Sequence, residues 1–594
     1  MKDKFIVPII LIILLSLVSY INVFGNEFVW DDHVFILDNA DIRSFNFKLF
    51  FSEDVDGLYR PLRSLHYALV YSIAGKEEFL YHFNSLFFHI LISILVFLLI
   101  YEVISKRNVS LIAALIFAVH PIHTGRVTNI TAGFDLLGIF FMLLSFYLYV
   151  KYSKNDNKNY FFASLLLFLI AVFASEEAIV LPILIILYEF TFNREKFKEI
   201  FTKNNSNNKK FQNILIIKNF IPYFVVALFY IAVRFVVVGF KGRLEEYLAG
   251  NFFLTMLTML KVYVYYIYLL IVPVNLTLFR DVEAVVSIFD FRVIISALIL
   301  IAIVFFAVKN HKNKVIFFSV FWFFITLIPF SNILPLQVFM AERYLYVPSI
   351  AFSLLVAYTI INLFNNKIFN NKKIIKNGIL LFMVVLLTFY VFSTVNRNNE
   401  SRDNLTLWSK TVLTNPNNSR AHDNLGFTYD HLGDTEKALA EFEKAVSLQE
   451  DNFRALANLG VAYAKFGRYD ESINALQKSI SVRDYHKTYD KLGLVYVEVN
   501  EEEKAIASFK EAIKINFRYA KAHNDLGTVY GKIGEFDLAL SEFNLAINID
   551  KDYADAHYNL GILLEFLDED ASKEFEIAFA LEPDNELYRG KVGK

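Results

Sequence analysis

The sequence predicts an all-α protein in two parts: a polytopic helical membrane domain over residues 1–396, followed by an α-solenoid over residues 397–594. Two observations predict this division. The first part contains one long apolar run after another, and the whole chain of 594 residues is 56% hydrophobic with a mean hydropathy of +0.42, too apolar for a soluble protein. The second part is charged and alanine-rich, and its pattern repeats at a fixed interval.

Clusters of Lys and Arg between the apolar runs mark cytoplasmic loops. Three apolar runs lie between the third and the fourth of these clusters, but two cytoplasmic loops must be separated by an even number of crossings. We expect the run at 252–272 not to cross, because it carries Lys261 at its centre. Eleven crossings then place the N-terminus in the cytoplasm and the solenoid outside, in a bacterial-type inner or plasma membrane. The twelve apolar runs span residues 5–23, 80–104, 109–121, 133–150, 160–175, 177–192, 216–238, 252–272, 293–308, 315–331, 346–364 and 377–395.

The first outer loop, residues 24–79, carries the adjacent carboxylates Asp31 and Asp32 just after Trp30. An interfacial Trp commonly fixes the depth of a membrane segment, so this pair is expected at the water interface. A carboxylate there can take the proton of an acceptor hydroxyl. Neighbouring side chains usually point different ways, so we expect one carboxylate to act as the base and the other to hold the loop. The sequence does not separate the two, and Asp32 is our choice for the base.

Further ionisable residues gather at the expected outer ends of the apolar runs. Charges at membrane depth are costly and usually pair or line a cavity, so we expect a polar cavity that opens outward. A histidine pair separated by three positions across a proline is a poor zinc site, so no metal is expected. The set comprises His82, His120, His123, Asp135, Glu177, Glu342 and Tyr344, together with Arg60, Arg126 and Arg343.

The second part repeats every 34 or 33 residues, as the glycines at 426, 460, 493, 527 and 561 show. Each glycine follows a leucine, and small and aromatic positions such as Ala438, Phe442 and Ala445 come later in register. This is the pattern of tetratricopeptide (TPR) repeats, paired helices that stack into a curved array with a concave binding face. The sequence predicts a partial repeat followed by about five repeats.

A polar residue stands two positions before each of these glycines, on the inner helix of its repeat. A side-chain amide can both donate to and accept from a peptide backbone, so the row is a candidate peptide-binding groove. Simple solvation of the inner face is the alternative, and the sequence leaves both open. The row comprises Asn424, Asn458, Lys491, Asp525 and Asn559.

Several short motifs keep a specific order along the chain. They are Phe28–Asp32; Tyr59–Leu62; Tyr81–Asn84 with His89; His120–Thr124; Asp135–Leu137; Glu177–Ala178 with Pro182; and Ala341–Ser349. With these motifs the membrane part resembles the GT-C class of lipid-linked glycosyltransferases. The complete arrangement resembles the transmembrane and TPR-containing O-mannosyltransferases and their prokaryotic relatives.

The resemblance implies transfer of a sugar from a polyprenyl- or dolichyl-phosphate donor to a protein Ser or Thr. Asp31 or Asp32 would activate the acceptor, and the departing phosphate would meet Arg343, Arg126 or Arg60. The lipid-linked sugar is the donor substrate, and no cofactor or divalent metal is expected. The expected partners are the bilayer, this donor and a protein or peptide acceptor in the TPR groove. The net charge of −2 gives no indication of nucleic acid.

Two other functions fit the same sequence. A membrane-anchored TPR scaffold on a degenerate transferase fold would have no use for the outer carboxylates. A transferase that modifies a glycan or a lipid would use them on a different acceptor.

Overall fold

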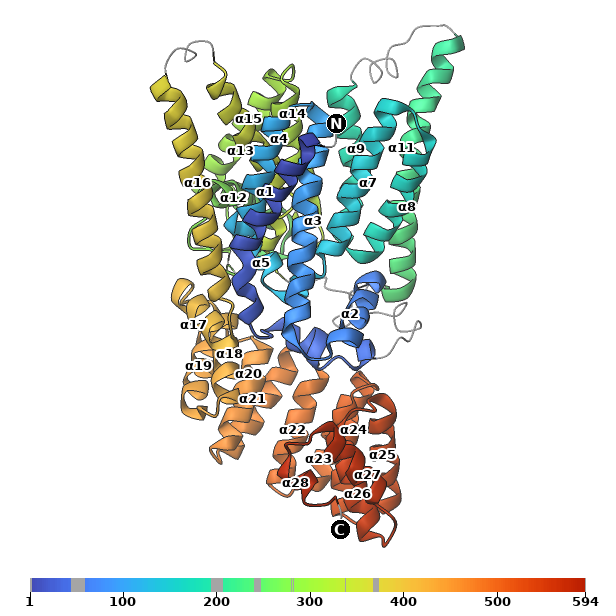
Figure 1. The fold of residues 1–594 in the computed structure, drawn as a ribbon. Coiled ribbons are helices and arrows are strands. Elements are labelled where there is room, and N and C mark those ends of the chain that lie inside the picture. Colours follow the sequence, from blue (N-terminus) through green and yellow to red (C-terminus); the bar gives the residue numbers. More distant parts are fainter. Residues whose placement is uncertain are drawn as a thin grey trace. The chain divides into compact units, whose positions relative to one another are not determined.

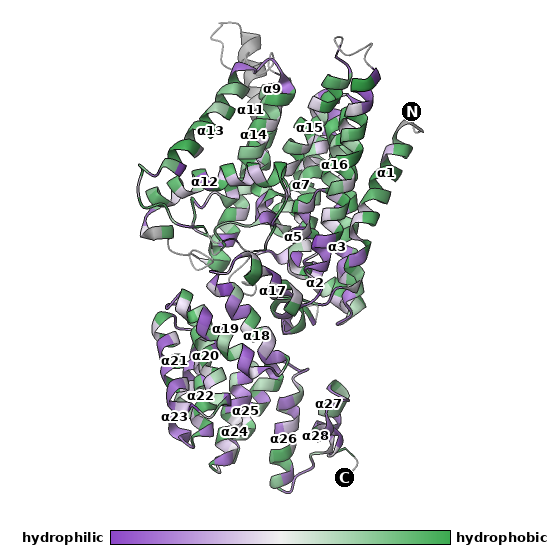
Figure 2. Ribbon diagram, turned by 90° about the vertical axis from the view of Figure 1, so that its left-hand side faces the viewer, coloured by the Kyte–Doolittle hydropathy of each residue, from purple (hydrophilic) through white to green (hydrophobic). Residues whose placement is uncertain are grey.

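The computed structural model describes residues 3–43, 59–193, 207–239, 247–278, 280, 282–336, 338–366 and 373–592. Contacts divide the chain into two compact units, Met1–Leu407 and Trp408–Lys594. Helices build both units (Figure 1), and the prediction of an all-α membrane region followed by TPR repeats is confirmed. The helices of the first unit are mostly apolar, whereas those of the second alternate between hydrophilic and hydrophobic residues (Figure 2).

Each of the twelve apolar runs coincides with a helix of the first unit. Short helical turns interrupt the longer helices, and two of them, α5 and α6, follow a break at Pro121. The main elements are α1 (Asp3–Tyr20), α2 (Pro61–Ala74), α3 (Glu78–Ile104), α4 (Arg107–Val119), α5 (Thr124–Val127), α6 (Ile130–Gly133), α7 (Leu136–Asn155), α8 (Lys158–Ala174), α9 (Leu181–Phe192), α11 (Asn207–Val238), α12 (Phe252–Ile271), α13 (Phe291–Lys309), α14 (Lys314–Thr326), α15 (Ser349–Phe364) and α16 (Lys373–Asn399).

In the part of the chain that the structure describes, fewer helices than the expected eleven meet the length and composition criteria for a membrane crossing. Among the described residues, seven helices are long and apolar enough to cross, or eight if the two helical segments joined at a 50° bend near Pro121 form one crossing. The expected count included shorter helices such as α8 and α15. α12, which we expected not to cross, meets the length and composition criteria despite Lys261, whose ammonium donates to the carbonyl of Glu283 (3.2 Å). The multiple apolar helices are those of an integral membrane protein.

Small residues let neighbouring membrane helices approach closely. α7 packs along α8, where the hydroxyls of Ser145 and Ser164 lie 3.0 Å apart. A Cβ on Gly138 of α7 would lie 2.4 Å from the side chain of Ser175, so only glycine fits there. Close approach of this kind stabilises helix pairs in lipid, where the hydrophobic effect does not drive association.

The second unit is a stack of helical hairpins, with the repeat glycines at the contact between the two helices of each hairpin. A Cβ on Gly493 would lie 2.6 Å from the ring of Phe509, and Gly426 and Phe442 meet in the same way. The predicted small and aromatic positions therefore form the seams. The helices are α17 (Asn404–Thr414), α18 (Ser419–His431), α19 (Thr435–Leu448), α20 (Phe453–Lys465), α21 (Tyr469–Val482), α22 (His486–Glu498), α23 (Glu502–Ile515), α24 (Ala520–Lys532), α25 (Phe536–Ile549), α26 (Ala554–Phe566), α27 (Ser572–Leu581) and α28 (Glu586–Arg589).

Candidate functional site

Asp32 anchors the loop that follows the first membrane helix. Its side chain is fully buried, and its carboxylate accepts hydrogen bonds from the backbone N–H groups of Val29 (3.1 Å) and Thr131 (2.8 Å) and from the Thr131 hydroxyl. Burial raises the pKa of Asp32 to about 7, and the three hydrogen bonds oppose this rise. Both oxygens are therefore used to hold the loop against α6.

Asp31 is the partly exposed member of the pair. The residue before it, Trp30, has a φ of +52°, a left-handed conformation that costs a non-glycine residue about 1 kcal/mol. The two carboxylates thus differ in burial: Asp32 anchors the loop, and Asp31 is the more accessible of the two. Residues 44–58 of the predicted catalytic loop lie outside the described residues.

The strained loop is held by residues 398–404, here called the junction, which connect α16 to α17. The backbone N–H of Trp30 donates to Oδ1 of Asn404 (2.9 Å), and that of Glu27 donates to the carbonyl of Arg402 (2.8 Å). Sequence reasoning missed these contacts, because Trp30 and Asn404 are 374 positions apart and belong to no recognisable motif. The junction therefore fixes the backbone of the loop at Glu27 and at Trp30.

Asn398 provides a second, fully buried contact between the junction and the loop. Its amide donates to the carbonyl of Ser19 (2.8 Å) and to Oδ1 of Asn22 (2.8 Å), and its side-chain oxygen accepts from the hydroxyl of Thr128 (2.7 Å). Its carbonyl accepts from the amide of Asn26 (3.0 Å). Asn398 thereby joins the end of α16 to the end of α1 and to the segment before α6.

Five charged side chains, here called the arginine cluster, lie together at the N-terminal end of α2, on α5, immediately before α7 and on the turn before α9. Asp135 accepts from Arg60 (2.9 Å) and Arg63 (3.2 Å) with one oxygen and from Arg126 (2.9 Å) with the other. Arg126 also pairs with Glu177. Among the described residues, three guanidinium groups thus contact two carboxylates. We missed Arg63, although it lies on the first turn of α2, only three residues after Arg60.

The three arginines predicted to meet the donor phosphate have different surroundings. Arg126 is 1% exposed, is engaged by two carboxylates and also donates to the carbonyl of Arg343 (3.2 Å). Arg60 is more accessible, with 15% of its side chain exposed. Arg343 is partly exposed, and its guanidinium lies 5.4 Å from the ring centre of Tyr344. Arg60 and Arg343 are therefore the more accessible of the three, and Arg126 is held between two carboxylates.

One stretch of chain supports both parts of this arrangement. Thr131 binds Asp32, while Arg126 and Asp135, which flank Thr131 closely in sequence, hold the arginine cluster. The loop carboxylates and the cations are thereby attached to the same short segment between α4 and α7.

The three histidines expected to line a cavity are buried and connect different segments. His82 donates to the carbonyl of Asn26 (3.0 Å), and His123 bonds the hydroxyl of Ser349 (2.8 Å). His120 donates to the carbonyl of Leu270 (3.0 Å) and accepts from the N–H of Ile122 (3.2 Å). Among the described residues, no group of three or more His, Cys, Asp or Glu side chains could hold a metal ion.

Glu342 and Tyr344 lie on the turn that carries Arg343. Glu342 is buried, accepts from the backbone N–H of Thr277 and lies 3.6 Å from Arg397. Burial raises the pKa of Glu342 to about 7, although Arg397 opposes the rise. The Tyr344 hydroxyl donates to the carbonyl of Val338 (3.0 Å). Both residues fix the conformation of the turn.

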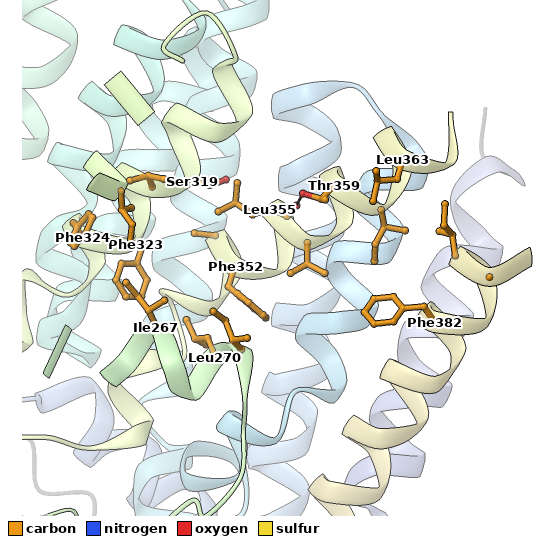
Figure 3. A pocket seen from close by; sticks show the side chains of 18 of the residues that line it. Ile267, Leu270, Ser319, Phe323, Phe324, Phe352, Leu355, Thr359, Leu363 and Phe382 are labelled. Atoms are coloured by element: carbon orange, nitrogen blue, oxygen red, sulfur yellow. Dashed lines mark hydrogen bonds between the residues drawn. The ribbon is translucent and has the colours of Figure 1, made fainter. Parts of the chain in front are cut away.

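An apolar cavity of about 840 Å³ lies between α12, α14, α15 and α16. In Figure 3, Phe382 of α16 lies across from Phe352 of α15, and Leu270 and Ile267 of α12 lie beside Phe352. Leu270 also connects this wall to the segment between α4 and α7, because its carbonyl binds His120 (3.0 Å). The volume is within the range of small-molecule sites, and the apolar lining suits a hydrocarbon chain.

Two of the residues predicted to form the peptide groove, Asn458 and Lys491, contact each other across neighbouring repeats. The amide of Asn458 donates to Asp423 (2.8 Å) and its oxygen accepts from Lys491 (2.6 Å). Asn559 also contacts the preceding repeat, where its amide donates to Asn524 (2.9 Å). The remaining two are bound within their own helices: Asn424 donates to the carbonyl of Arg420 (2.8 Å), and Asp525 accepts from Lys521 (2.8 Å).

Comparison with known proteins locates both parts of this chain. Residues 61–204, which contain all of the arginine cluster except Arg60, match the family model of dolichyl-phosphate-mannose-protein mannosyltransferase. Residues 431–467, 493–534 and 532–565 match the TPR repeat, and 453–486 match the tetratricopeptide repeat. The resemblance to the transmembrane and TPR-containing O-mannosyltransferases is confirmed.

Three relatives illustrate the extent of this similarity. Protein O-mannosyl-transferase F38B6.6 of Caenorhabditis elegans is 25% identical over 465 residues, which cover 74% of this chain and 62% of the relative. Protein O-mannosyl-transferase TMTC3 of Mus musculus is 27% identical over 491 residues (76% and 52%), and human TMTC4 is 26% identical over 466 residues (69% and 62%). The chain thus spans about half to three fifths of the length of these O-mannosyltransferases.

Solved structures match the repeats. A thermophilic TPR protein of Thermus thermophilus, TTC0263, is 24% identical, and the match covers 29% of this chain and 96% of that protein with a TM-score of 0.28. A TM-score this low supports no inference about ligands.

Proposed function

We propose that this chain is a membrane glycosyltransferase that transfers a sugar, with mannose as the first candidate, from a polyprenyl-phosphate donor to a Ser or Thr of a protein. The attachment of Asp32 and of the arginine cluster to one segment, through Thr131, Arg126 and Asp135, carries this proposal. This attachment brings a carboxylate that activates the acceptor and cations that bind the phosphate into one site. The reaction requires both kinds of group.

In the proposed reaction, Asp31 accepts the proton of the acceptor hydroxyl as the hydroxyl oxygen bonds to the anomeric carbon of the sugar. The bond between that carbon and the phosphate oxygen breaks, and the lipid phosphate leaves with the bonding electrons. Arg60 and Arg343 stabilise the charge that develops on the phosphate. Asp32 and the junction hold Asp31 in position.

The isoprenoid chain of the donor occupies the apolar cavity between α12 and α16. The lining is almost wholly aliphatic and aromatic, and the carbonyl of Leu270 in its wall binds His120 of the segment between α4 and α7. A donor with its chain there can extend its phosphate toward Arg126 and Arg343, which hydrogen-bond each other through the Arg343 carbonyl (3.2 Å).

The site acts at the outer face of the membrane. The N-terminus is cytoplasmic, and Asp31 and the solenoid are on the opposite side, as the Lys and Arg clusters in the loops indicate. The TPR repeats bind the protein acceptor. Reporter fusions after Asn396 and within residues 200–208 test this topology, and a cytoplasmic signal after Asn396 would contradict it.

The deciding experiment measures transfer directly. The purified chain in phosphatidylcholine liposomes receives polyprenyl-phosphate-mannose and a Ser/Thr peptide, and intact-mass spectrometry follows the peptide. We expect one added hexose, and none with the Asp31→Asn variant. Oligosaccharide and lipid acceptors are offered in parallel. Transfer to these alone would replace the protein acceptor, and no transfer to any acceptor would favour a scaffold.

A further inference from the structure

α12 stays beside the segments that build the candidate site from position 259 to position 270. These segments are the chain between α14 and the turn that carries Arg343, and the chain between α4 and α7. A helix that crossed the membrane would move away from one face by about 1.5 Å with every residue. Three hydrogen bonds instead hold α12 at that face: Met259 accepts from the amide of Asn332 (3.3 Å), Tyr266 accepts from the N–H of Ala341 (3.3 Å), and the carbonyl of Leu270 binds His120 (3.0 Å).

The chain after α12 turns back and runs along the first half of the helix. The ammonium of Lys261 donates to the carbonyl of Glu283 (3.2 Å), and the N–H of Val285 donates to the hydroxyl of Thr258 (3.0 Å). Residues 282–290 form neither a helix nor a strand, and most of them are exposed. Irregular backbone that faces lipid does not occur inside the hydrocarbon region, because its N–H and C=O groups would lack partners. The middle of α12 therefore lies outside the hydrocarbon core.

Four charged side chains gather beside the middle of α12. Lys261 lies at that position of the helix, and Arg292 at the start of α13 pairs with both Glu283 (2.9 Å) and Asp290 (2.9 Å). Glu283 is 74% exposed, so water or lipid headgroups have to surround it. If α12 crossed the membrane as a helix of 20 residues, these charges would lie near the centre of the bilayer, where charge is costly. Their level therefore marks the membrane surface.

Apolar side chains project from the same stretch of chain. Val286 and Phe289 are more than four fifths exposed, and Ile288 and Phe291 are at least half exposed. Exposed apolar groups this close to charges are typical of a segment that lies in the membrane interface. Phe291 is also the first residue of α13, which is long and apolar enough to cross. The stretch is thus continuous with a membrane-spanning helix.

We propose that α12 and residues 282–291, here called the interface segment, lie in the headgroup layer on the side of the candidate site and do not cross the membrane. The partner of this segment is the lipid surface: its charges stay among the headgroups, while Val286, Phe289 and Phe291 enter the acyl region. The two cations and the two carboxylates balance, so zwitterionic lipid is sufficient. α11 and α13 then cross in opposite directions, with both ends of α12 on one side.

The position of α12 bears on the apolar cavity, because Ile267, Leu270 and Ile271 at the end of the helix line it. A helix held at the surface places this wall just below the headgroups, within reach of a lipid from the same leaflet. The inference does not depend on sugar transfer, and it stands if the proposed function fails.

Single cysteines test this position, because the chain has no cysteine of its own. Lys261→Cys, Glu283→Cys and Ile301→Cys are placed in the full chain in phosphatidylcholine vesicles and treated with a membrane-impermeant maleimide. Ile301 is the matched control, because it lies in the middle of α13 and is 64% exposed. We expect Lys261→Cys and Glu283→Cys to react on the order of 10-fold faster than Ile301→Cys, because apolar surroundings suppress the reactive thiolate. All three should react after denaturation in SDS.

The side of the membrane is read from Lys312→Cys, which follows α13. In vesicles of one orientation, Lys261→Cys and Glu283→Cys should react from one side and Lys312→Cys from the other. Reaction of Glu283→Cys from the side of Lys312→Cys would overturn the proposal. So would rates for Lys261→Cys and Glu283→Cys as slow as that of Ile301→Cys, since α12 would then be a crossing. Glu283→Cys decides alone if Lys261→Cys lowers the yield of folded protein, because its exposed side chain can be removed at little cost.

A bimane label on Phe289→Cys measures the depth of the apolar side chains. Phosphatidylcholine brominated near its headgroup should quench this label more than phosphatidylcholine brominated near its chain ends. The same label on Ile301→Cys should show the reverse order. A label at Phe289 that neither lipid quenches would overturn the insertion and would favour a protein partner at this patch.

Discussion

The membrane unit and the solenoid use the same charged residues in different surroundings. In the arginine cluster, Arg126 and its partner Glu177 have little contact with water, whereas the ion pairs of the solenoid are mostly half exposed, as Lys465 with Asp430 is. Desolvation makes a buried pair costly to break, while water can replace either partner of an exposed pair. The membrane unit therefore uses charge to fix a conformation, whereas the exposed ion pairs of the solenoid add little to its stability.

The largest expected effect concerns the two aspartates of the loop. Asp31→Asn should lower the rate of sugar transfer about 100- to 10,000-fold without loss of folding, because it removes the base and keeps the shape. Asp32→Asn should instead lower the yield of folded protein, because its amide would place N–H groups against the N–H of Val29 or Thr131. Transfer rates measured at matched levels of folded protein distinguish the base from the anchor. A larger rate loss in Asp32→Asn than in Asp31→Asn would make Asp32 the base and Asp31 the anchor.

The next effect compares a buried with an exposed ion pair. Arg126→Met leaves Glu177 buried without its cation and should destabilise the membrane unit by about 3–5 kcal/mol. Lys465→Gln should cost the solenoid less than about 1 kcal/mol, because 45% of the lysine side chain is exposed. The chain has no cysteine, so one labelled cysteine placed in either unit reports its unfolding separately. Similar costs in both units would contradict the comparison.

Acid should stabilise the loop. The pKa of Asp32 is raised to about 7 in the folded protein, from about 3.9 when unfolded, so the folded state binds more protons between these values. Stability should therefore fall as the pH rises from about 4 to about 7, by at most about 1.4 kcal/mol per pH unit for this one group. Asp32→Asn should flatten the slope for the membrane unit, and parallel slopes would show that Asp32 keeps an ordinary pKa.

The smallest effect tests the junction. Asn404→Ala removes the acceptor of the Trp30 N–H, a loss of about 1 kcal/mol, and should lower kcat about fivefold with little change in the KM for the peptide. Asn404→Asp retains the acceptor oxygen and should restore kcat. Asn310→Ala is the control, because its amide donates only within its own helix turn (2.9 Å). A rise in KM with constant kcat would place Asn404 in acceptor binding instead.

Local patterns predicted most of the fold. The twelve apolar runs and the repeat glycines each depend on neighbouring residues, so composition and spacing were enough to find α3, α7 or the hairpin of Gly493 and Phe509. Composition did not reveal helix length, because a run such as that of α8 is as apolar as the longer ones but forms a helix below the length criterion for a crossing.

The candidate site was only partly predictable. Its charged residues were found by type and position, but their pairing depends on tertiary contacts: Arg126 with Glu177, and Asp32 with Thr131. Asp31 and Asp32 differ in burial, and two adjacent aspartates in a sequence do not show which of them is the buried one. Arg63 was detectable from its spacing to Arg60, whereas the contact of Asn404 with Trp30 joins the two ends of the membrane unit and has no local signature.

The junction limits how this protein can be divided. A chain cut after α16 would keep every membrane helix and every charged residue of the arginine cluster, yet it would lose Arg402 and Asn404 and, with them, the acceptors for the N–H groups of Glu27 and Trp30. A solenoid transplanted from another protein would carry the same defect unless residues 398–404 came with the membrane helices. The natural border for engineering therefore lies inside α17, and the first turn of that helix belongs to the membrane unit.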